Sequence, residues 1–374
     1  MKKKINFHFL IIVLILISLG ALFLATLSAP ESFKKFGNTN YYLFHQIYSI
    51  AIGFALAFFA FKIPLRILKK ILPALFFISI IASLIVLFPA VGAKLLGAKR
   101  WINIGDISFQ PSELLKITAI LYLSLWLSIK LGESRVKGSF FNAKRSYNNL
   151  IKIFLPFIFF LALIVAILAM QKDLGTLSVI IISLLAVYFA SGTPLWHTVI
   201  AILTVMGGAL ALIRIEPYRI QRLLIFLNPE KDPLGIGFHL RQSLLAVGSG
   251  GIFGKGLGTS SQKFGFLPEA MGDSIFAIIG EETGIVGCGV ILILFTMFFI
   301  YGIKIAYHAT DRFSYLAVIG ISTWIVSQAF INIGSAIGIF PVTGIPLPFV
   351  SYGGSHIIAE MIGVGIMLNI SKNS

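Results

Sequence analysis

Long, uninterrupted runs of apolar residues alternate with polar breaks along most of this 374-residue chain. Most of the runs contain about 17–23 residues, which is the length that a helix needs to cross the ~30 Å hydrocarbon core of a bilayer. The pattern predicts ten transmembrane helices, at about residues 5–27, 44–61, 71–90, 111–129, 153–170, 174–190, 195–213, 273–301, 315–337 and 352–370. Because the runs lack the alternation of a membrane β-barrel, the expected fold class is an all-α polytopic membrane protein.

Lysine and arginine are concentrated in alternate polar breaks. Residues 2–4 are all lysine, 62–70 holds four basic residues and 130–152 holds six, and these breaks share one side of the membrane if the spans alternate. Because short basic loops stay in the cytoplasm, both termini are expected inside. A Lys-rich start also opens signal peptides, but the first apolar run exceeds their usual ~7–15-residue core, so it is expected to be a retained helix.

The hydrophilic segment 214–272 then lies outside the cytoplasm, between the seventh and eighth helices. Hydrophobic residues make up 57% of the chain and charged residues only 12%, which excludes a soluble protein. The net charge of +16 could indicate nucleic-acid binding, but membrane topology and contact with anionic lipid account for it, so no nucleic-acid partner is expected. Residues 1–374 are expected to form one transmembrane domain.

Metal and nucleotide motifs are scarce in the sequence. Cys288 is the single cysteine and lies in an apolar run, and the six histidines lack metal-ligand spacing, so neither a zinc nor a haem site is expected. The Gly-rich stretch 248–258 lacks the GxxxxGK[ST] pattern, and no strand precedes it, so no nucleotide site is expected. We interpret this stretch as flexible backbone over a lipid substrate.

Three carboxylates stand close together where the long outer segment meets the eighth helix. A carboxylate beside hydrocarbon costs about 2.5–3.5 kcal/mol, so Asp273, Glu281 and Glu282 are expected to have partners or a task. Asp273 is expected in the first helical turn, where the helix dipole favours its ionised form and where it could simply be a cap. Glu281 would lie ~12 Å deeper and Glu282 would point away from Asp273, so the two glutamates are not expected to share a role. The cluster predicts a polar cavity open to the outside.

Some polar residues have both a structural and a functional interpretation. Glu113 and Lys116 lie three residues apart on one helix face, either as an ion pair or as a lysine that holds a carboxylate or phosphate in a cavity. Asp173 either caps the sixth helix or binds a metal ion or a sugar hydroxyl. His356 and Glu360, four residues apart, are expected to form a buried pair.

The outer segment and the eighth helix carry two further signals. Gly280 and Gly284 suit close helix packing. Arginines of the outer segment could bind phosphate bidentately, namely Arg214, Arg219, Arg222 and Arg241. Taken alone, these patterns support an enzyme that acts on a lipid-linked substrate and a transporter about equally.

A set of ordered motifs carries a resemblance that decides between these classes. The motifs lie at residues 99–102, 108–113, 173–176, 228–229, 241–243, 265–269 with 273, 280–282 and 347–355. Together they resemble the SEDS family, the shape, elongation, division and sporulation proteins. The resemblance implies a peptidoglycan glycosyltransferase that polymerises lipid II at the outer face of the bacterial cytoplasmic membrane. It also implies a class B penicillin-binding protein as transpeptidase partner, among other divisome or elongasome membrane proteins.

The resemblance also implies roles for particular residues. Asp273 corresponds to the family's essential aspartate and is expected to be the general base on the attacking sugar hydroxyl. Glu113 and Lys116 correspond to the acidic residue and lysine of the fourth helix, with the lysine near that aspartate. The leaving pyrophosphate needs positive charge, from Arg241, Lys116 or a divalent cation such as Mg²⁺ or Mn²⁺. The other residues expected to bind substrate are Asp173, Gln262, Ser351 and Ser355.

Finer features favour one branch of the family. Residues 228–235, 262–265 and 279–282 resemble the division branch, whereas 340–349 resembles the elongation branch, so a role in division is favoured. An elongation polymerase and a lipid II flippase are the alternatives; a flippase would need a continuous polar path across the bundle. The chain departs from the family at Met271, where a histidine is common, and at 272–274, where Gly-Asp-Ser replaces Thr-Asp-Phe. It also departs at 171–173, which leaves the shape of that turn open.

Overall fold

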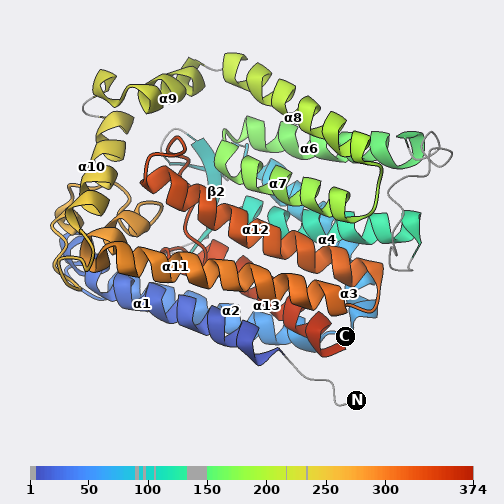
Figure 1. The fold of residues 1–374 in the computed structure, drawn as a ribbon, viewed down its shortest axis with the longest axis horizontal. Helices are drawn as coiled ribbons and strands as arrows, with labels where there is room; N and C mark the ends of the chain where they lie inside the picture. The colour runs from blue at the N-terminus through green and yellow to red at the C-terminus, as the bar shows by residue number, and fades with distance from the viewer. Residues whose placement is uncertain are drawn as a thin grey trace.

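A bundle of long helices makes up most of the computed structural model, which describes residues 6–88, 92–95, 98–104, 107–132, 150–215, 217–232 and 235–373 (Figure 1). The α-helices are α1 (Phe7–Phe36), α2 (Tyr41–Lys62), α3 (Leu65–Ile85), α4 (Pro111–Leu131), α6 (Leu155–Met170), α7 (Leu174–Ala190), α8 (Leu195–Ile215), α9 (Pro217–Leu227), α10 (Ile236–Ser249), α11 (Ile275–His308), α12 (Arg312–Ala336) and α13 (Gly354–Asn373). Short π and 3₁₀ turns are η2 (Leu150–Phe154), η3 (Pro229–Lys231) and η4 (Gln262–Phe264).

The helices confirm a polytopic membrane fold. In the described part of the chain, eight helices are long and apolar enough to cross a membrane, and α7 and most of α8 form shorter apolar helices. α1 begins and α13 ends at the end of the bundle opposite α9 and α10, as expected if both termini share one side (Figure 1). The lysines at 2–4 and most basic residues of 130–152 lie outside the described residues. We call the end that carries α9 and α10 the loop end.

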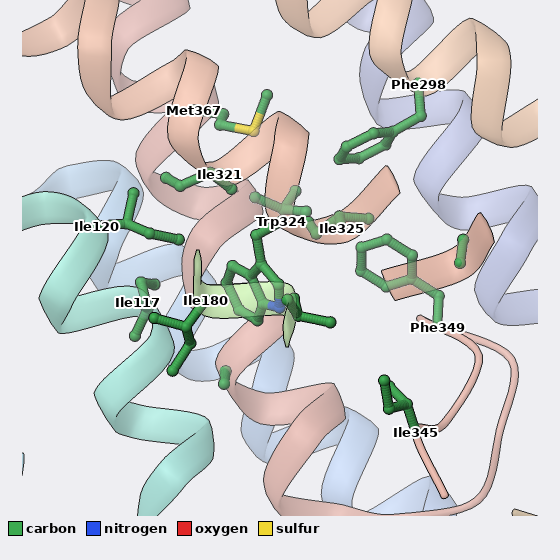
Figure 2. Packing of buried hydrophobic residues seen from close by; sticks show 14 of the residues in the cluster. Ile117, Ile120, Ile180, Phe298, Ile321, Trp324, Ile325, Ile345, Phe349 and Met367 are labelled. Atoms are coloured by element: carbon green, nitrogen blue, oxygen red, sulfur yellow. The ribbon is translucent and has the colours of Figure 1, made fainter. Parts of the chain in front are cut away.

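The core of the bundle is organised around α12, which contacts α4, α7, α11 and α13. Trp324 of α12 is fully buried, with Ile117 of α4 and Ile180 of α7 on one side of it (Figure 2). Phe298 and Phe349 lie on the other side. α12 carries fully buried polar residues, among them Gln328 and Asn332, and its central position places them between the other elements.

A small sheet replaces the loop expected between the third and fourth helices. Strands β1 (Gly92–Leu95), β2 (Ala98–Ile104) and β3 (Ile107–Phe109) form an antiparallel meander in the order β1-β2-β3. β3 leads directly into α4, whose first residue is Pro111, as the sequence predicts. The missing N–H of a proline costs nothing at the first helical position, so the sheet and this proline together set where α4 begins.

The eighth predicted span is a helix broken at Gly284. Gly284 has a φ of 65°, and α11 consists of two helical segments that meet there. The Gly-rich stretch enters the break: Lys255 N donates to Glu281 O (3.0 Å), and Ile285 N donates to Gly251 O (3.0 Å). Backbone hydrogen bonds therefore fix this stretch against α11, which contradicts the flexibility expected of it. That it covers a lipid substrate stays a prediction.

Glu281 and Glu282 hold the same loop, so the expectation that they have separate roles is also wrong. The Ser260 hydroxyl donates to Glu281 Oε2, and the Ser260 N–H donates to Glu282 Oε1 (3.3 Å). Lys255 Nζ lies 2.8 Å from Glu281 Oε1. The close packing expected at Gly280 is present, because a Cβ at Gly250, just after α10, would lie 1.9 Å from Gly280 O.

The hydrophilic segment 214–272 is largely helical. α9 and α10 form an arch over the loop end, and α10 packs against the first part of α11 (Figure 1). The Asp232 carboxylate accepts hydrogen bonds from the N–H groups of Gly235 and Ile236, which fixes the start of α10. The segment thus forms a structured cover beside the start of α11, where Asp273 lies.

Candidate active site

Asp273 lies in a turn just before α11 rather than in its first helical turn. α11 begins at Ile275, with Ser274 as its N-cap residue. Three hydrogen bonds hold the turn: Tyr352 N donates to Met271 O (2.9 Å), Ser351 Oγ donates to Gly272 O (2.6 Å), and Asn332 Nδ2 donates to Asp273 O (2.8 Å). The backbone of Asp273 is therefore fixed by α12 and by the segment before α13.

The Asp273 carboxyl is only partly exposed, and its surroundings do not keep it fully ionised. Removal from water raises its pKa to about 7; nearby Glu269 acts in the same direction, while Ser274 and Arg222 act weakly against it. This differs from the expectation that the helix dipole would hold it ionised. A carboxyl whose pKa lies close to neutral pH is suited to accept a proton from a weakly acidic hydroxyl.

Beside Asp273 lie one residue that was not found from the sequence, His239, and one that was predicted only as a phosphate-binding arginine, Arg222. His239 of α10 lies with its Nε2 2.6 Å from the Ser274 hydroxyl, and burial lowers the pKa of His239. The Ser274 hydroxyl is also 3.5 Å from Asp273 Oδ1. Arg222 of α9 donates to Val342 O (3.5 Å) and adds positive charge beside both titratable groups. No motif links residues so far apart in the sequence, so only the fold reveals this grouping.

Three turns at the loop end contain non-glycine residues with left-handed backbone. These are Lys172 (φ 59°), Glu269 (φ 50°) and Phe349 (φ 62°). Such conformations are uncommon outside glycine and persist only where the surrounding structure imposes them. Glu269 is in the turn that carries Asp273, and Phe349 is in the segment that supports it, so strain is concentrated around this aspartate.

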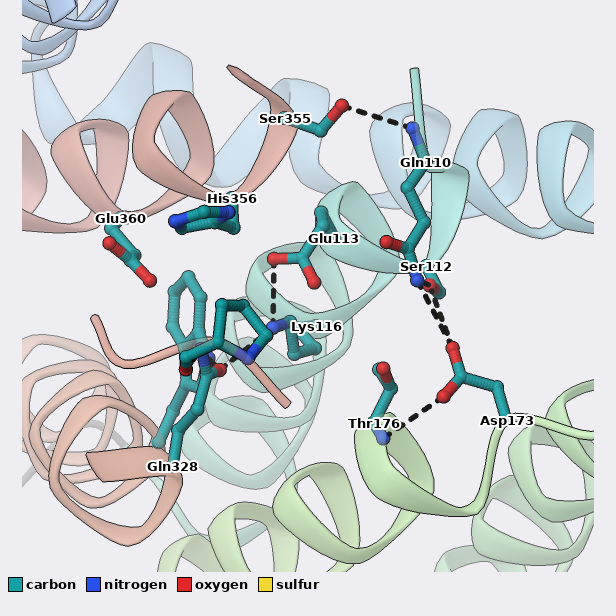
Figure 3. A network of polar contacts seen from close by, with 12 residues as sticks. Gln110, Ser112, Glu113, Lys116, Asp173, Thr176, Gln328, Ser355, His356 and Glu360 are labelled. Atoms are coloured by element: carbon teal, nitrogen blue, oxygen red, sulfur yellow. Dashed lines mark hydrogen bonds and ion pairs between the residues drawn. The ribbon is translucent and has the colours of Figure 1, made fainter. Parts of the chain in front are cut away.

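Lys116 is enclosed in the bundle and does not line an open cavity. Its Nζ lies 2.8 Å from Glu113 Oε2 and 2.9 Å from Gln328 Oε1, and it stands 5.2 Å from the centre of the Trp324 ring (Figure 3). Lys116 is 1% and Glu113 3% exposed. The ion-pair interpretation is confirmed, and a phosphate could not reach this lysine without a rearrangement.

The link between Lys116 and the aspartate runs along α12. Gln328, which binds Lys116, donates from Nε2 to Pro346 O (3.1 Å). Asn332, one turn further, donates to Ile345 O (2.7 Å) as well as to Asp273 O. A methyl group at Gly344 would lie 3.9 Å from Asp273 Oδ2. The segment 344–346 thus lies beside Asp273 and is held there by two polar residues of α12.

Asp173 is the N-cap of α7, as one of its two interpretations predicts. Its Oδ1 accepts from Thr176 N (3.2 Å), and its Oδ2 accepts from Gln110 Nε2 (3.1 Å) (Figure 3). Arg100 of β2 lies 3.5 Å from Oδ1 and also donates to the backbone oxygens of residues 171 and 172. Asp173 therefore joins the sheet, α4 and α7, and its binding of a substrate or metal ion stays a prediction.

Both serines near the start of α13 bind backbone. Ser351 is fully buried and accepts from Leu347 N (2.8 Å) in addition to its bond to Gly272 O. Ser355 accepts from Gln110 N (3.1 Å) and donates to Ser108 O (3.2 Å). Ser351 thus holds the turn that carries Asp273, Ser355 holds the start of α4, and substrate binding by either serine stays a prediction.

His356 and Glu360 are buried, but each binds the backbone of the segment before α13. His356 Nε2 lies 3.2 Å from Ser351 O, and Glu360 Oε2 accepts from Phe349 N (2.8 Å). The expected burial is confirmed, but the contacts of the two side chains in the described residues go to backbone and not to one another. The partner of each residue is the left-handed turn around Phe349, which these contacts help to fix.

Arg241 and Gln262 lie in the cover formed by 214–272. Arg241 lines an open groove of about 510 Å³ on α10 together with Leu244, Leu245, Gly248 and Ser249. Gln262 begins η4, and its backbone oxygen accepts from Leu267 N (3.3 Å). Both stay candidates for substrate binding. The side chain of Arg219 lies outside the described residues.

The described residues offer no ready divalent-cation site. They contain no group of three or more His, Cys, Asp or Glu side chains placed to hold a metal ion. Asp273 and Glu269 are close enough to interact electrostatically, but these two side chains do not complete a coordination shell, and Mg²⁺ commonly takes its remaining ligands from substrate phosphates and water. The divalent cation therefore stays a prediction, and no step below is assigned to it.

Comparisons with known proteins identify close relatives. The family model described as cell cycle protein, FtsW/RodA/SpoVE, matches residues 7–374. Stage V sporulation protein E of Bacillus subtilis is 37% identical over 376 residues, covering 100% of this chain and 98% of that protein. The probable peptidoglycan glycosyltransferase FtsW of Coxiella burnetii is 34% identical over 360 residues, covering 95% and 93%.

A solved structure shares the fold. That structure is described as showing the structural coordination of polymerization and crosslinking by a peptidoglycan synthase complex. It matches this chain with a TM-score of 0.78 and 25% sequence identity. The match covers 99% of this chain and 98% of that one. Sequence and fold therefore agree over almost the whole chain.

Proposed function

Because the chain belongs to the FtsW/RodA/SpoVE family of cell cycle proteins, we propose that it is a peptidoglycan glycosyltransferase. It polymerises lipid II into glycan strands at the outer face of the bacterial cytoplasmic membrane. The observation that carries this proposal is the Asp273 carboxyl, which has a pKa of about 7 and a backbone held by α12 and the segment before α13. Carboxyls whose pKa is shifted towards neutral by burial and a nearby like charge are concentrated at catalytic sites, which supports this assignment.

The chemistry is an inverting transfer with Asp273 as general base. The 4-hydroxyl of the acceptor sugar attacks the anomeric carbon of the donor, and Asp273 takes the hydroxyl proton as the new C–O bond forms. The bond from the anomeric carbon to undecaprenyl pyrophosphate breaks, and its electron pair leaves with the pyrophosphate. Arg222, whose charge acts on Asp273, and Arg241 of the groove are the cations of the cover that could stabilise this leaving group.

Lys116 has a different role in this proposal from the one that the sequence predicts. Its ammonium neutralises Glu113 inside the bundle and binds Gln328, so it sets the position of α12 relative to α4. Asn332 transmits that position to Asp273. Lys116 is thus a positioning residue, and contact with the pyrophosphate is not required of it.

Cell division is the process that we favour. Relatives named FtsW share 34–37% identity over at least 95% of this chain. The similarity to stage V sporulation protein E supports a second candidate, the same chemistry in spore formation. The related peptidoglycan synthase complex couples polymerization to crosslinking, which supports a class B penicillin-binding protein as the partner of this chain.

The function is tested by incubating purified full-length protein with fluorescently labelled lipid II, alone and with a class B penicillin-binding protein. Glycan polymer that forms with wild-type protein and not with Asp273→Asn supports the proposal. Proteoliposomes that move lipid II across the bilayer without making polymer would instead support a flippase. The absence of both activities, with binding to the partner retained, would indicate a scaffold.

A further inference from the structure

His239, Ser274 and Asp273 form a continuous polar chain at the loop end. His239 Nε2 lies 2.6 Å from Ser274 Oγ, which in turn lies 3.5 Å from Asp273 Oδ1. His239 belongs to α10, whereas the other two residues belong to the turn before α11. These three side chains therefore connect the Asp273 carboxyl to the half-buried imidazole of His239 in the cover.

The Ser274 side chain does not cap α11, although Ser274 is the N-cap residue of that helix. At that position a serine hydroxyl normally accepts a hydrogen bond from the first helical turn. The Ser274 hydroxyl instead faces His239, Asp273 and Pro268 O (2.9 Å). A hydroxyl that has one proton and three possible acceptors can change the acceptor to which it donates.

We propose that His239 positions and relays protons for Asp273, acting through the Ser274 hydroxyl. The proposal rests on the glycosyltransferase function above. After Asp273 has taken the proton of the sugar hydroxyl, it passes a proton to Ser274 Oγ while the Ser274 hydroxyl proton moves to His239 Nε2. The imidazolium then releases its proton to water, Ser274 keeps one proton, and Asp273 is again a carboxylate for the next sugar.

The charges around His239 suit this role. Burial lowers the pKa of His239, a hydrogen bond to the Pro268 backbone acts against this, and the charge of Arg222 acts with it. The net direction is downward, so the imidazole is neutral at pH 7 and can accept a proton. The charge of Glu269 acts on Asp273, while the Asp232 carboxylate at the start of α10 accepts hydrogen bonds from two backbone N–H groups. The His239 imidazolium is a stronger acid than the Asp273 carboxyl, because its pKa is lowered and that of Asp273 is raised. The proton therefore does not remain on His239.

The first test does not depend on turnover. Nitrogen-15 NMR of the histidine side chains is recorded for full-length protein in nanodiscs while the pH is varied. The His239 signals, assigned with His239→Gln, are expected to show a second inflection where Asp273 titrates, and this inflection is lost in Ser274→Ala. His308, at the other end of α11, is the control and shows no such change. A second inflection that persists in Ser274→Ala, or is absent from the wild type, overturns the proposal.

The second test uses lipid II polymerisation. His239→Gln and Ser274→Ala are each expected to lower kcat about tenfold, with KM changed by less than about twofold. The double variant should lose no more than either single variant, because both interrupt one path. Unchanged kcat, or losses that multiply, contradict the relay. If the wild type makes no polymer although the NMR inflection is present, the proposed function fails and the relay stands.

Discussion

The side-chain amide of Asn332 lies 2.8 Å from the backbone oxygen of Asp273 and also binds Ile345 O at 2.7 Å. Asn332→Ala leaves both buried oxygens without this donor, at a cost of about 1–3 kcal/mol each, and frees the turn that carries Asp273. We expect kcat for lipid II polymerisation to fall about 10–100-fold. Ser327→Ala on the same helix is the control, because within the described residues the Ser327 hydroxyl bonds only to Trp324 O. Equal activities of the two variants would show that Asn332 does not position the aspartate.

The ion pair between Lys116 and Glu113 predicts an asymmetry in stability. Lys116→Met leaves the Glu113 carboxylate buried without its ammonium partner, which costs about 3–5 kcal/mol. The double variant Glu113→Leu/Lys116→Met removes both charges and should recover most of that loss. Thermal unfolding of detergent-solubilised protein measures both effects. A double variant no more stable than Lys116→Met would argue against a simple buried pair.

Gly284 should be far less replaceable than Gly289 on the same helix. A Cβ at Gly284 would lie 2.4 Å from Ile252 O, and the φ of 65° is unfavourable for alanine, whereas a Cβ at Gly289 meets nothing within 4 Å. Gly284→Ala is expected to lower the midpoint of thermal unfolding and to speed tryptic cleavage after Lys255. Gly289→Ala should be neutral or stabilising, because alanine favours a helix. Similar effects of both variants would contradict an inserted loop at Gly284.

The raised pKa of Asp273 predicts that this residue destabilises the protein at high pH. The folded protein holds the proton up to a pH of about 7, whereas an unfolded aspartate loses it near pH 4. Stability from this group therefore declines as pH rises from about 4 to 7 and is lowest above 7. Asp273→Asn should raise the thermal midpoint by a few degrees at pH 8 and have little effect at pH 4.5. A variant that is less stable than wild type at pH 8 would refute the raised pKa.

Features set by local sequence were predictable. Pro111 marks the start of α4, the three-residue spacing of Glu113 and Lys116 produces their ion pair, and Asp173 caps α7. Each depends on residues within one or two helical turns. The apolar runs likewise identify the membrane helices, because a bilayer imposes a minimum length and composition on anything that crosses it.

Features that depend on distant segments were not predictable. His239 reaches Ser274 only because α10 folds back on the start of α11, and no periodicity reports that return. The break at Gly284 needs a loop from more than 25 residues upstream to replace its helical hydrogen bonds. The expectation of an ionised Asp273 took the helix dipole into account but not the burial that the cover and the segment 344–346 impose.

The pH dependence of kcat/KM for lipid II decides whether Asp273 is the base. This parameter reports the free enzyme, so the Asp273 carboxyl predicts activity that is low at acidic pH and rises to a plateau, with a midpoint near the pKa of about 7. Asp273→Asn, which keeps the shape but cannot accept the proton, should show no measurable polymerisation at any pH. A wild-type profile that is flat between about pH 5.5 and 8.5, or Asp273→Asn protein that polymerises lipid II at the wild-type rate, would contradict a catalytic base at this position.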